Sequence, residues 1–481
     1  MEYLGIGIAV VVTAFALLLA KYYIHMLQLE GYFVSQYIPH LFARIRNPKF
    51  LFKPQKAKKP LVFTARIKRL YVCLFIITLA LNVLIGIWGK IYLFPLMLLT
   101  LILISVLVLF ASLLMIPVEK GIAKWYVNDA KKILKARKDL KIVAITGSYG
   151  KTSTKFILST ILSERFACLT PPSSYNTTMG VVRVIRERLQ PDDEVFICEM
   201  GSRHIGDIKE ICDFVHPHNA LITSIGPQHL DTFGSIEGVK KGKFELIEAL
   251  PKDGLAVFAS TNEHILELFE KCNNKKLTAG FSDSDKVRAE DISVGCSGST
   301  FTLCYKDEKI ECITKLLGKH NISNILVASA MALEMGLTME EVKRGISKIQ
   351  PIEHRLQIVN QSPVTIIDDA FNSSPNGASA ALDVLGAFEG RRIIVTPGFV
   401  ELGKDQDKYH FELGKKIGEN ADVAILVGKK RTEKIKEGIG DSKCEVYQVP
   451  SLTEATALLH KITFNGDVVL FENDLPDNFN E

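Results

Sequence analysis

The chain has 481 residues, of which 47% are hydrophobic and 23% charged, and its formal net charge is +5. This length allows about three domains. The mean hydropathy of +0.17 is high for a soluble protein and favours a membrane part joined to a soluble part. The small net charge gives no support to nucleic-acid binding. Nine cysteines without a C-x-x-C pair indicate reduced thiols rather than disulfides or zinc ligands.

Three apolar stretches in the first quarter of the chain are expected to cross a membrane as helices. They run from Leu4 to Ala20, from Tyr71 to Trp88 and from Ile91 to Pro117, so residues 1–117 form the predicted membrane region. The first stretch lacks a basic segment before it and a small-residue cleavage site after it, which makes a signal peptide the weaker interpretation. A tight turn at Gly89-Lys90 predicts that the last two stretches form a helical hairpin.

The segment between the first and second stretches is strongly basic, and no acid interrupts its run of cations. Its cations are Arg44, Arg46, Lys49, Lys53, Lys56, Lys58, Lys59, Arg66, Lys68 and Arg69. Because positive loops stay in the cytoplasm, we expect a multi-pass cell-membrane protein with its N-terminus outside and its catalytic domains in the cytoplasm. The segment could also bind an anionic membrane lipid or lipid-linked substrate, the alternative being a plain topology signal. Residues 118–140 are expected to form a helical linker.

Residues 141–154, K-I-V-A-I-T-G-S-Y-G-K-T-S-T, predict a phosphate-binding loop between a buried strand and a helix. Gly147 and Gly150 let the backbone amides point inward at the positive end of the helix dipole. Lys151 would reach the outer phosphates of a nucleotide, and the Thr152 hydroxyl would hold Mg²⁺. The full Walker pattern has a further glycine where this chain has isoleucine, and an ordinary glycine turn before a helix is the alternative.

Two later strands end in side chains that suit a metal site. Glu199 lies at the end of the strand from Glu194 to Met200, and His229 follows the strand from Ala220 to Ile225. Ligands of open parallel sheets lie beyond the carboxyl ends of the strands, so the phosphate loop, Glu199 and His229 are predicted to share one crevice. With the Thr152 hydroxyl they would make a magnesium environment, although His is an uncommon Mg²⁺ ligand. The alternatives are a carboxylate that simply ends a strand and a histidine that donates within its loop.

A second α/β unit begins after Gln350, and alternating strands and helices predict another doubly wound sheet. The central ATP-binding domain is therefore predicted at residues 141–350 and the C-terminal, Rossmann-like domain at residues 351–481. The second unit carries D-D-A-F-N-S-S-P at the end of its first strand, again a ligand-facing position. Its predicted strands are Val364 to Ile367, Arg392 to Val395, Val423 to Val427, Glu445 to Val449 and Val468 to Phe471.

Together these motifs resemble the Mur ligases, the ATP-dependent amide-bond-forming enzymes of peptidoglycan precursor synthesis. The most similar branch adds D-alanyl-D-alanine to a UDP-muramoyl tripeptide. The motifs E-M-G-S-R-H-I-G-D-I and G-P-Q-H-L-D-T-F-G-S resemble the family's Glu-Met-Gly and Gly-x-x-His-Leu segments, which implies roles around magnesium for Thr152, Glu199 and His229. T-G-S-Y-G-K-T-S is similar to the family's ATP loop. It implies nucleotide contacts from Gly147, Ser148, Gly150, Lys151, Thr152 and Ser153.

Further residues take roles only through this resemblance. Lys243 with Glu245 lines up with the family's Lys-x-Glu, in which a carbamylated lysine binds a second magnesium; by spacing alone Lys243 belongs to a solvated face. Lys151, Lys243 and His229 would then be the catalytic residues, with ATP and two Mg²⁺ ions as the implied cofactors. The resemblance also implies nucleotide contacts from Asn321 in G-K-H-N-I-S-N, Arg355, Asp368 and Asn372.

Three departures from the family pattern concern the substrates. Membrane stretches stand in place of the soluble domain that grips the UDP-sugar. V-T-P-G-F-V-E-L-G replaces the usual Gly-Asp-Met before Glu-Leu-Gly, and the chain ends F-E-N-D-L-P-D-N-F-N-E without a basic Lys-Gly-Ser-Arg-like ending. We therefore expect a membrane-anchored ligase that joins an amino acid or peptide to a cell-envelope precursor through an acyl phosphate. Its acceptor would be lipid-linked or a wall polymer at the inner leaflet.

Two other function classes remain as alternatives. A P-loop ATPase could drive transport or assembly through its own helices, although spans without buried charge make a poor pathway. A ligase-fold scaffold without catalysis is the other, and it leaves unexplained why the chain retains Lys151, Thr152, Glu199, His229 and Lys243.

Overall fold

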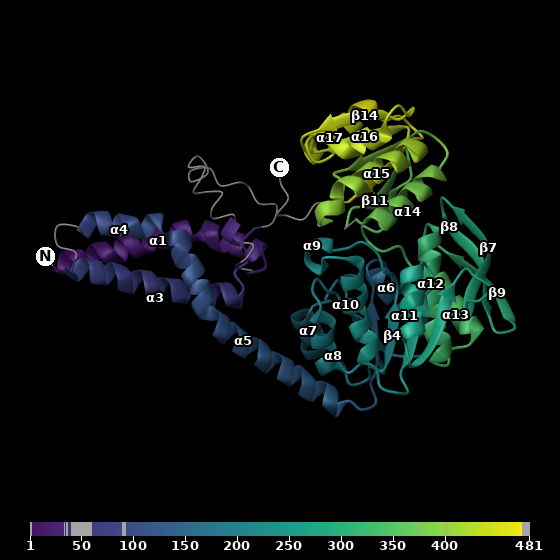
Figure 1. Cartoon of the computed structure of the whole chain (residues 1–481), viewed down its shortest axis with the longest axis horizontal. Coiled ribbons are helices and arrows are strands. Elements are labelled where there is room, and N and C mark those ends of the chain that lie inside the picture. Colours follow the sequence, from purple (N-terminus) through teal and green to yellow (C-terminus); the bar gives the residue numbers. More distant parts are fainter. Residues whose placement is uncertain are drawn as a thin grey trace. The chain divides into compact units, whose positions relative to one another are not determined.

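The computed structural model describes residues 2–32, 34, 37–39, 60–88, 93–371, 373–400 and 402–473. The predicted turn at Gly89-Lys90, Asn372 and most of the basic segment lie outside these residues. The chain divides into two compact units, one up to Tyr126 and one from Val127 onward (Figure 1).

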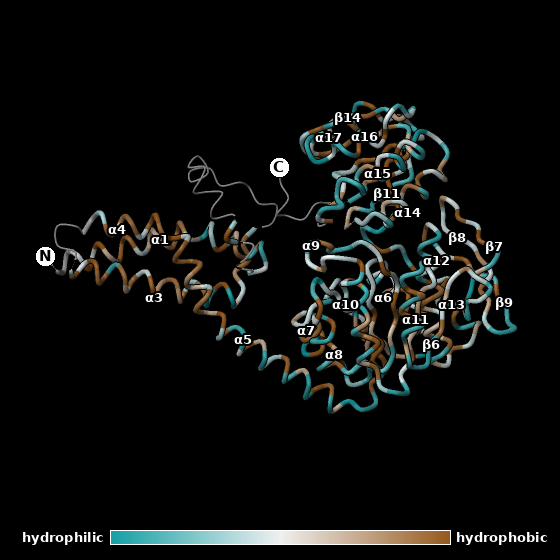
Figure 2. The backbone as a smooth tube through the Cα atoms, in the orientation of Figure 1, coloured by the Kyte–Doolittle hydropathy of each residue, from teal (hydrophilic) through white to brown (hydrophobic). Residues whose placement is uncertain are grey.

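The first unit is a set of strongly apolar helices (Figure 2). They are α1 (Glu2–Leu29), α3 (Ala65–Trp88), α4 (Leu93–Ile102) and the larger part of α5 (Ile104–Ala136), whose residues from Val127 onward belong to the second unit. Three helical segments, Gly5–Leu29, Ala65–Trp88 and Ile104–Ala136, are long and apolar enough to cross a membrane by length and composition.

The third predicted stretch differs from the structure in its bounds. It is divided at Leu103 into α4 and α5, and α5 does not end at Pro117 but continues to Ala136. A proline inside a helix removes one backbone hydrogen bond, and a helix of 33 residues retains enough others to continue past it. The lysine-rich linker is therefore helical, as expected, and forms one helix with the apolar segment before it.

Small residues and a buried polar cluster join the helices of this unit. A Cβ atom on Gly5 would lie 2.5 Å from the carbonyl oxygen of Gly86, so α1 and α3 pack backbone to backbone. The fully buried Asn82 of α3 donates its Nδ2 to Thr13 Oγ1 of α1 at 3.1 Å. Its Oδ1 accepts from Thr100 Oγ1 of α4 at 3.0 Å, so three helices share one polar cluster.

The second unit begins with a nine-stranded sheet in the order β2-β3-β1-β4-β5-β6-β7-β8-β9. Its strands are parallel up to β7, and β8 and β9 are antiparallel. The strands are β1 (Lys141–Thr146), β2 (Cys168–Leu169), β3 (Val195–Glu199), β4 (Asn219–Ile222), β5 (Leu255–Ala259), β6 (Lys275–Gly280), β7 (Val287–Gly295), β8 (Gly298–Tyr305) and β9 (Glu308–Thr314). The helices are α6 (Lys151–Leu162), α7 (Thr178–Arg188), α8 (Asp207–Val215), α9 (Leu230–Phe233), α10 (Ile236–Glu248), α11 (Glu263–Lys271), α12 (Lys319–Glu334) and α13 (Met339–Lys348).

Strand register brings the predicted site residues together at the carboxyl ends of the parallel strands. Ile145 of β1 pairs with Glu199 of β3, and Thr146 pairs with Ile222 of β4. All five residues of β3 are buried, as expected for a parallel strand covered on both faces. The phosphate loop, Glu199 and the segment after β4 therefore leave the sheet side by side.

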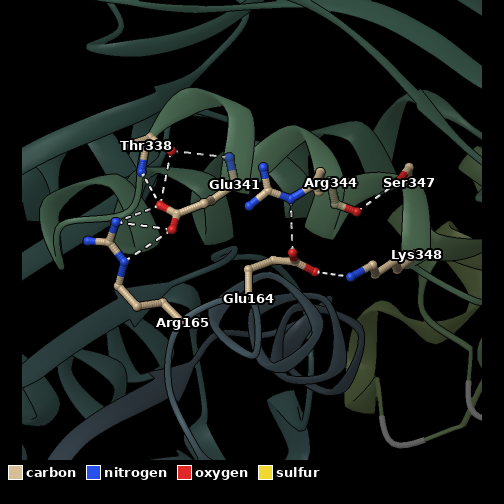
Figure 3. Close-up of polar contacts among 7 residues, drawn as sticks. All are labelled: Glu164, Arg165, Thr338, Glu341, Arg344, Ser347 and Lys348. Atoms are coloured by element: carbon tan, nitrogen blue, oxygen red, sulfur yellow. Dashed lines mark hydrogen bonds and ion pairs between the residues drawn. The ribbon is translucent and has the colours of Figure 1, made fainter.

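The residues just after α6 are tied to α13 by ion pairs (Figure 3). Arg165 pairs with Glu341 at 2.8 Å, and Glu341 also completes a capping box with Thr338. Glu164 pairs with both Arg344 and Lys348, at 3.3 and 2.6 Å. Such exposed pairs contribute little singly, but a network of them restrains the helix.

The second sheet confirms the predicted C-terminal α/β unit. Its order is β10-β11-β15-β12-β13-β14, and only its first strand is antiparallel to its neighbour. Every one of the five predicted strands is present, and the edge strand β10 is added to them. The strands are β10 (Gln357–Asn360), β11 (Thr365–Asp369), β12 (Arg392–Thr396), β13 (Val423–Val427), β14 (Glu445–Val449) and β15 (Val468–Glu472). The helices are α14 (Pro375–Gly386), α15 (Gln406–Asn420), α16 (Glu433–Ile439) and α17 (Leu452–Ile462), with a short 3₁₀ helix at Gly403–Asp405.

Candidate nucleotide and magnesium site

The loop between β1 and α6 requires glycine at two positions. Gly147 has φ of 153°, and a Cβ there would lie 2.2 Å from Thr223 Oγ1. Gly150 has φ of 78° and precedes the first turn of α6, where a Cβ would lie 2.5 Å from Asn324 Oδ1. Both glycines adopt backbone conformations that other residues avoid, and neighbouring segments close on them. The predicted cradle of inward-facing amides is therefore stereochemically available.

Replacing Gly147 by alanine should weaken ATP binding by about tenfold or more, because the added methyl group must displace the loop from the β4 side. Calorimetric titration of the purified protein with ATP and Mg²⁺ measures the effect. Gly121→Ala in α5 is the matched control, since its new Cβ would have no heavy atom within 4 Å. Equal ATP affinity in both variants would contradict a role for this loop in binding.

Lys151 folds back onto its own loop. Its Nζ donates to the carbonyl oxygens of Gly147 at 2.6 Å and Ser148 at 3.1 Å. Desolvation lowers the pKa of Lys151 to about 8, partly offset by the charge of Glu199. Ser148 also ties the loop to the segment before His229, because its hydroxyl bonds to the backbone of Gly226 at 3.1 Å.

Glu199 is buried, with an exposed fraction of 1%, and several side chains converge on it. Its Oε1 accepts hydrogen bonds from Thr152 Oγ1 and Asn176 Nδ2, both at 3.0 Å. Its Oε2 lies 3.4 Å from Lys155 Nζ but accepts no hydrogen bond from any described residue. Thr152 and Glu199 thus meet as predicted, next to an oxygen that retains free acceptor capacity.

Lys155 is a charged member of this site that sequence reasoning missed. Its side chain is fully buried, and Nζ also donates to the carbonyl oxygen of Ser173 at 2.9 Å. Burial lowers its pKa, while Glu199 opposes the shift. Its spacing was the available signal, because a residue four positions after Lys151 lies on the same face of α6. Ser153, predicted to contact the nucleotide, lies buried in the first turn of the same helix.

Lys243 of α10 is buried rather than part of a solvated face. Its exposed fraction is 1%, and its Nζ donates to Ser202 Oγ at 2.8 Å. Burial, and then the positive charge of Lys151, hold the pKa of Lys243 well below its usual value, which favours an uncharged amine. Glu245, two residues on, holds the start of α8 in place, because its carboxylate accepts from the backbone N–H groups of Gly206 and Lys209, at 2.6 and 3.0 Å.

His229 lies in the segment after β4, on the predicted edge of the sheet. It precedes α9 with φ of 51°, a left-handed conformation that is uncommon outside glycine. Asn321 lies in the first turn of α12, where its Nδ2 donates to Leu317 O at 2.9 Å. Its Oδ1 accepts from Asn324 Nδ2 at 3.4 Å, and Asn324 in turn accepts from Thr154 of α6 at 3.2 Å. Asn324, which was not predicted, therefore connects Asn321 to the phosphate-loop helix.

Arg355 and Asp368 lie beside the second sheet. The Arg355 guanidinium stacks over the Phe371 ring at 4.3 Å, and burial lowers its pKa while the negative charge of Glu199 counteracts the shift. The Asp368 carboxylate lies 2.6 Å from His354 Nδ1 and accepts from the backbone N–H of Ala370 at 3.0 Å. Arg355 therefore belongs to the electrostatic surroundings of Glu199, whereas Asp368 is engaged with its own domain.

The donor set suits Mg²⁺ and nucleotide phosphates. A threonine hydroxyl and a carboxylate are oxygen ligands of the kind magnesium prefers, and Glu199 Oε2 is buried without a hydrogen bond from the described residues. Among those residues no three His, Cys, Asp or Glu side chains gather into a closed metal site. Magnesium often retains waters and substrate phosphates as its other ligands, so two protein oxygens fit it.

Two family descriptions match the second unit. The Mur ligase middle domain matches residues 145–332, and the Mur ligase glutamate ligase domain matches residues 354–472. Among curated proteins, the UDP-N-acetylmuramoyl-tripeptide–D-alanyl-D-alanine ligase of Haemophilus influenzae is 31% identical over 63% of this chain, and that of Escherichia coli is 30% identical over 60%. The chain spans 66% and 65% of the lengths of these two relatives. The Bacillus subtilis protein of the same name is 28% identical over 69% of this chain and 72% of its own length.

Solved structures give the same result. MurF from Acinetobacter baumannii superposes with a TM-score of 0.68 at 26% identity, covering 73% of this chain and 77% of that one. MurF from Thermotoga maritima, in complex with ADP, has a TM-score of 0.67 over 73% of this chain and 80% of its own, and at 21% identity it shows the fold alone. The predicted fold class, a P-loop Mur ligase centre followed by a C-terminal α/β domain, is confirmed.

Proposed function

This chain belongs to the Mur ligase family, and from that premise we propose that it is an ATP-dependent ligase forming an amide bond on a cell-envelope precursor. One observation carries the proposal: Thr152 and Lys155, in the helix that follows the glycine loop, both contact the buried carboxylate of Glu199. A fold kept only as a scaffold would gain nothing from two lysines held so close to a glycine-lined anion cradle, because desolvated charges are costly.

In the proposed reaction, a carboxylate of the acceptor attacks the γ-phosphate of ATP, which releases ADP and forms an acyl phosphate. An amine then attacks the acyl carbon, loses a proton and expels phosphate. The loop amides and Lys151 bind and orient the phosphates, while Thr152 and Lys155 fix the Glu199 carboxylate. Magnesium, when bound, neutralises charge on the transferred phosphoryl group. Arg355 would approach the same phosphates from the second domain, whose closure would exclude water.

We assign Lys243 as the carrier of a carbamate that helps to hold a second Mg²⁺. Carbamylation needs an uncharged amine, and burial that lowers the pKa of Lys243 supplies one. The Ser202 hydroxyl, 2.8 Å from Nζ, is positioned to support the modified group. His229 is proposed as a further group near the metals, and Asn321, Asp368 and Asn372 as nucleotide contacts.

The proposal also places the enzyme at the cytoplasmic face of the cell membrane with a lipid-linked acceptor. Three helices of sufficient length and hydropathy support the anchor. The matched family domains begin at residue 145, and long apolar helices precede them in the described part of the chain. An acceptor carried by a lipid would be held at the membrane without a dedicated soluble domain.

Product analysis tests this function. Protein purified with its helices in detergent should release ADP and phosphate in step with amide formation when a lipid-linked muramoyl peptide, an amine and Mg-ATP are present. The same assay with a soluble UDP-muramoyl peptide is the control, and we expect it to be at least about tenfold slower. ATP hydrolysis that needs neither carboxylate nor amine would instead favour a transport or assembly ATPase.

A further inference from the structure

The apolar unit contains a small pocket with polar walls near the ends of its helices. The empty space among its lining atoms is about 240 Å³ when the open solvent at its mouth is included, so it is a shallow hollow rather than an enclosed cavity. Two hydrogen bonds between Gln28 and Val62, at 2.8 and 3.0 Å, hold the end of α1 against the residues that precede α3. The pocket is lined by Tyr32, Arg66, Leu70, Ser112, Met115 and Glu119.

The pocket carries a positive charge that no acid among the described residues neutralises. Glu119 is already engaged, because both of its carboxylate oxygens accept hydrogen bonds from Arg69 at 2.7 Å. Arg66 lies instead over the ring of Tyr32, 3.7 Å from the ring centre, and no acid among the described residues pairs with it. The guanidinium is thus held in place by an aromatic face while its N–H donors remain available.

The remaining walls suit an amphiphile. Leu70 is 4% exposed and belongs to the core of the helices, and Met115 packs against that core. Ser112, 9% exposed, adds a hydroxyl between this apolar floor and the charged rim. A cation and a hydroxyl above an apolar floor match the junction between the head group and the chains of a lipid.

The residues that line the pocket lie near the ends of two apolar helices and on either side of the proline of a third. Arg66 is in the first turn of α3, so the positive end of the helix dipole adds to its charge. Tyr32 follows the end of α1, and Glu119 lies beyond Pro117 of α5. The basic segment between α1 and α3 predicts that this end of the helices faces the cytoplasm.

We propose that this pocket binds the anionic phosphate of a membrane lipid in the inner leaflet, with Arg66 as the phosphate-binding residue. The inference rests on the proposed membrane anchoring. It also narrows the proposed lipid-linked acceptor to lipids that carry an anionic phosphate. A guanidinium binds phosphate through paired hydrogen bonds, which an ammonium cannot reproduce.

The test is calorimetric titration of the full chain in uncharged detergent with dioctanoyl phosphatidic acid. We expect one saturable equivalent, with binding at least about tenfold weaker for Arg66→Gln and intermediate for Arg66→Lys. Lys68→Gln is the matched control: it makes the same charge change two residues away on an exposed side chain, and its affinity should stay within about twofold of the unmodified chain. Equal losses in Arg66→Gln and Lys68→Gln would overturn the proposal, because they would indicate a general basic surface.

Two further titrations separate the possible sources of phosphate. Dioctanoyl phosphatidylcholine, whose phosphate is neutralised by its own ammonium, should bind at least about tenfold more weakly. Inorganic phosphate binding as tightly as the phosphatidic acid would overturn the lipid assignment. ATP affinity, measured on the same samples, should not change in Arg66→Gln. If the unmodified chain bound lipid but not ATP, the ligase proposal would fail while the lipid site remained.

Discussion

Lys151→Ala should reduce amide formation by about a thousandfold or more, because it removes the cation expected to neutralise the outer phosphates of ATP. The side chain already donates to two carbonyl oxygens of the glycine loop, which holds its ammonium group beside that loop. ADP release measured with both substrates present reports the loss. Lys252→Ala, a change of the same kind in an exposed turn, should leave the rate within about twofold.

The same lysine should make ATP affinity depend on pH. With its pKa near 8 in the free protein, Lys151 is charged below that pH and increasingly neutral above it. A bound triphosphate favours the charged form, so binding above pH 8 must take up a proton and affinity should fall by up to about tenfold per pH unit. A flat ATP affinity between pH 7 and pH 9.5 would reject Lys151 as the phosphate-binding cation.

Lys243→Ala should reduce ligation by about a hundredfold to a thousandfold, with partial recovery when a short-chain carboxylate such as acetate is added. The added carboxylate would replace the lost carbamate oxygens in the cavity left by the side chain. Lys241→Ala, two residues away and exposed on the same helix, is the control and should retain its rate without acetate.

A direct measurement of the carbamate should accompany the kinetics of the Lys243 variant. Protein equilibrated with ¹³C-bicarbonate should give one carbamate signal in carbon NMR, and Lys243→Ala should remove it. Ser202→Ala should weaken the signal, since it deletes the hydroxyl that lies 2.8 Å from Nζ. Full activity of Lys243→Ala in the absence of acetate would reject the assignment.

The residues that sequence reasoning placed correctly lie at the ends of strands. Glu199 and the phosphate loop were predicted to meet because parallel strands share a carboxyl edge, and the register of β1 with β3 and the contact of Thr152 with Glu199 confirm it. Asn176 and Asn324 escaped prediction because their segments reach the loop only through tertiary packing. No local pattern brings Asn324 to Thr154, which is 170 residues earlier.

Lys243 and Lys155 show how charge can mislead an interpretation of the sequence. Three lysines near the start of α10 suggested a solvated face, yet Lys243 falls on the same helical stripe as the buried Val239 and Leu246. Lys155 likewise lies on the buried side of α6, between Thr152 and Leu158. In both helices the structure places a lysine on the buried stripe, where Lys243 contacts the Ser202 hydroxyl and Lys155 contacts the Glu199 carboxylate.

The Thr13–Asn82–Thr100 cluster bears on how the proposed membrane anchor can be engineered. If Thr13 were removed, the Asn82 side-chain amide would lose the acceptor of one N–H donor. In a bilayer this unpaired donor would destabilise the packing of the helices by roughly 1–2 kcal/mol. An unrelated apolar helix in place of α1 would thus still insert into a membrane, but Asn82 of α3 would lack the hydrogen bond that Thr13 of α1 provides. The N-terminal helix therefore packs specifically against the other helices. In a fusion protein, we expect the apolar unit to keep its packing only if all four helices α1, α3, α4 and α5 are retained together.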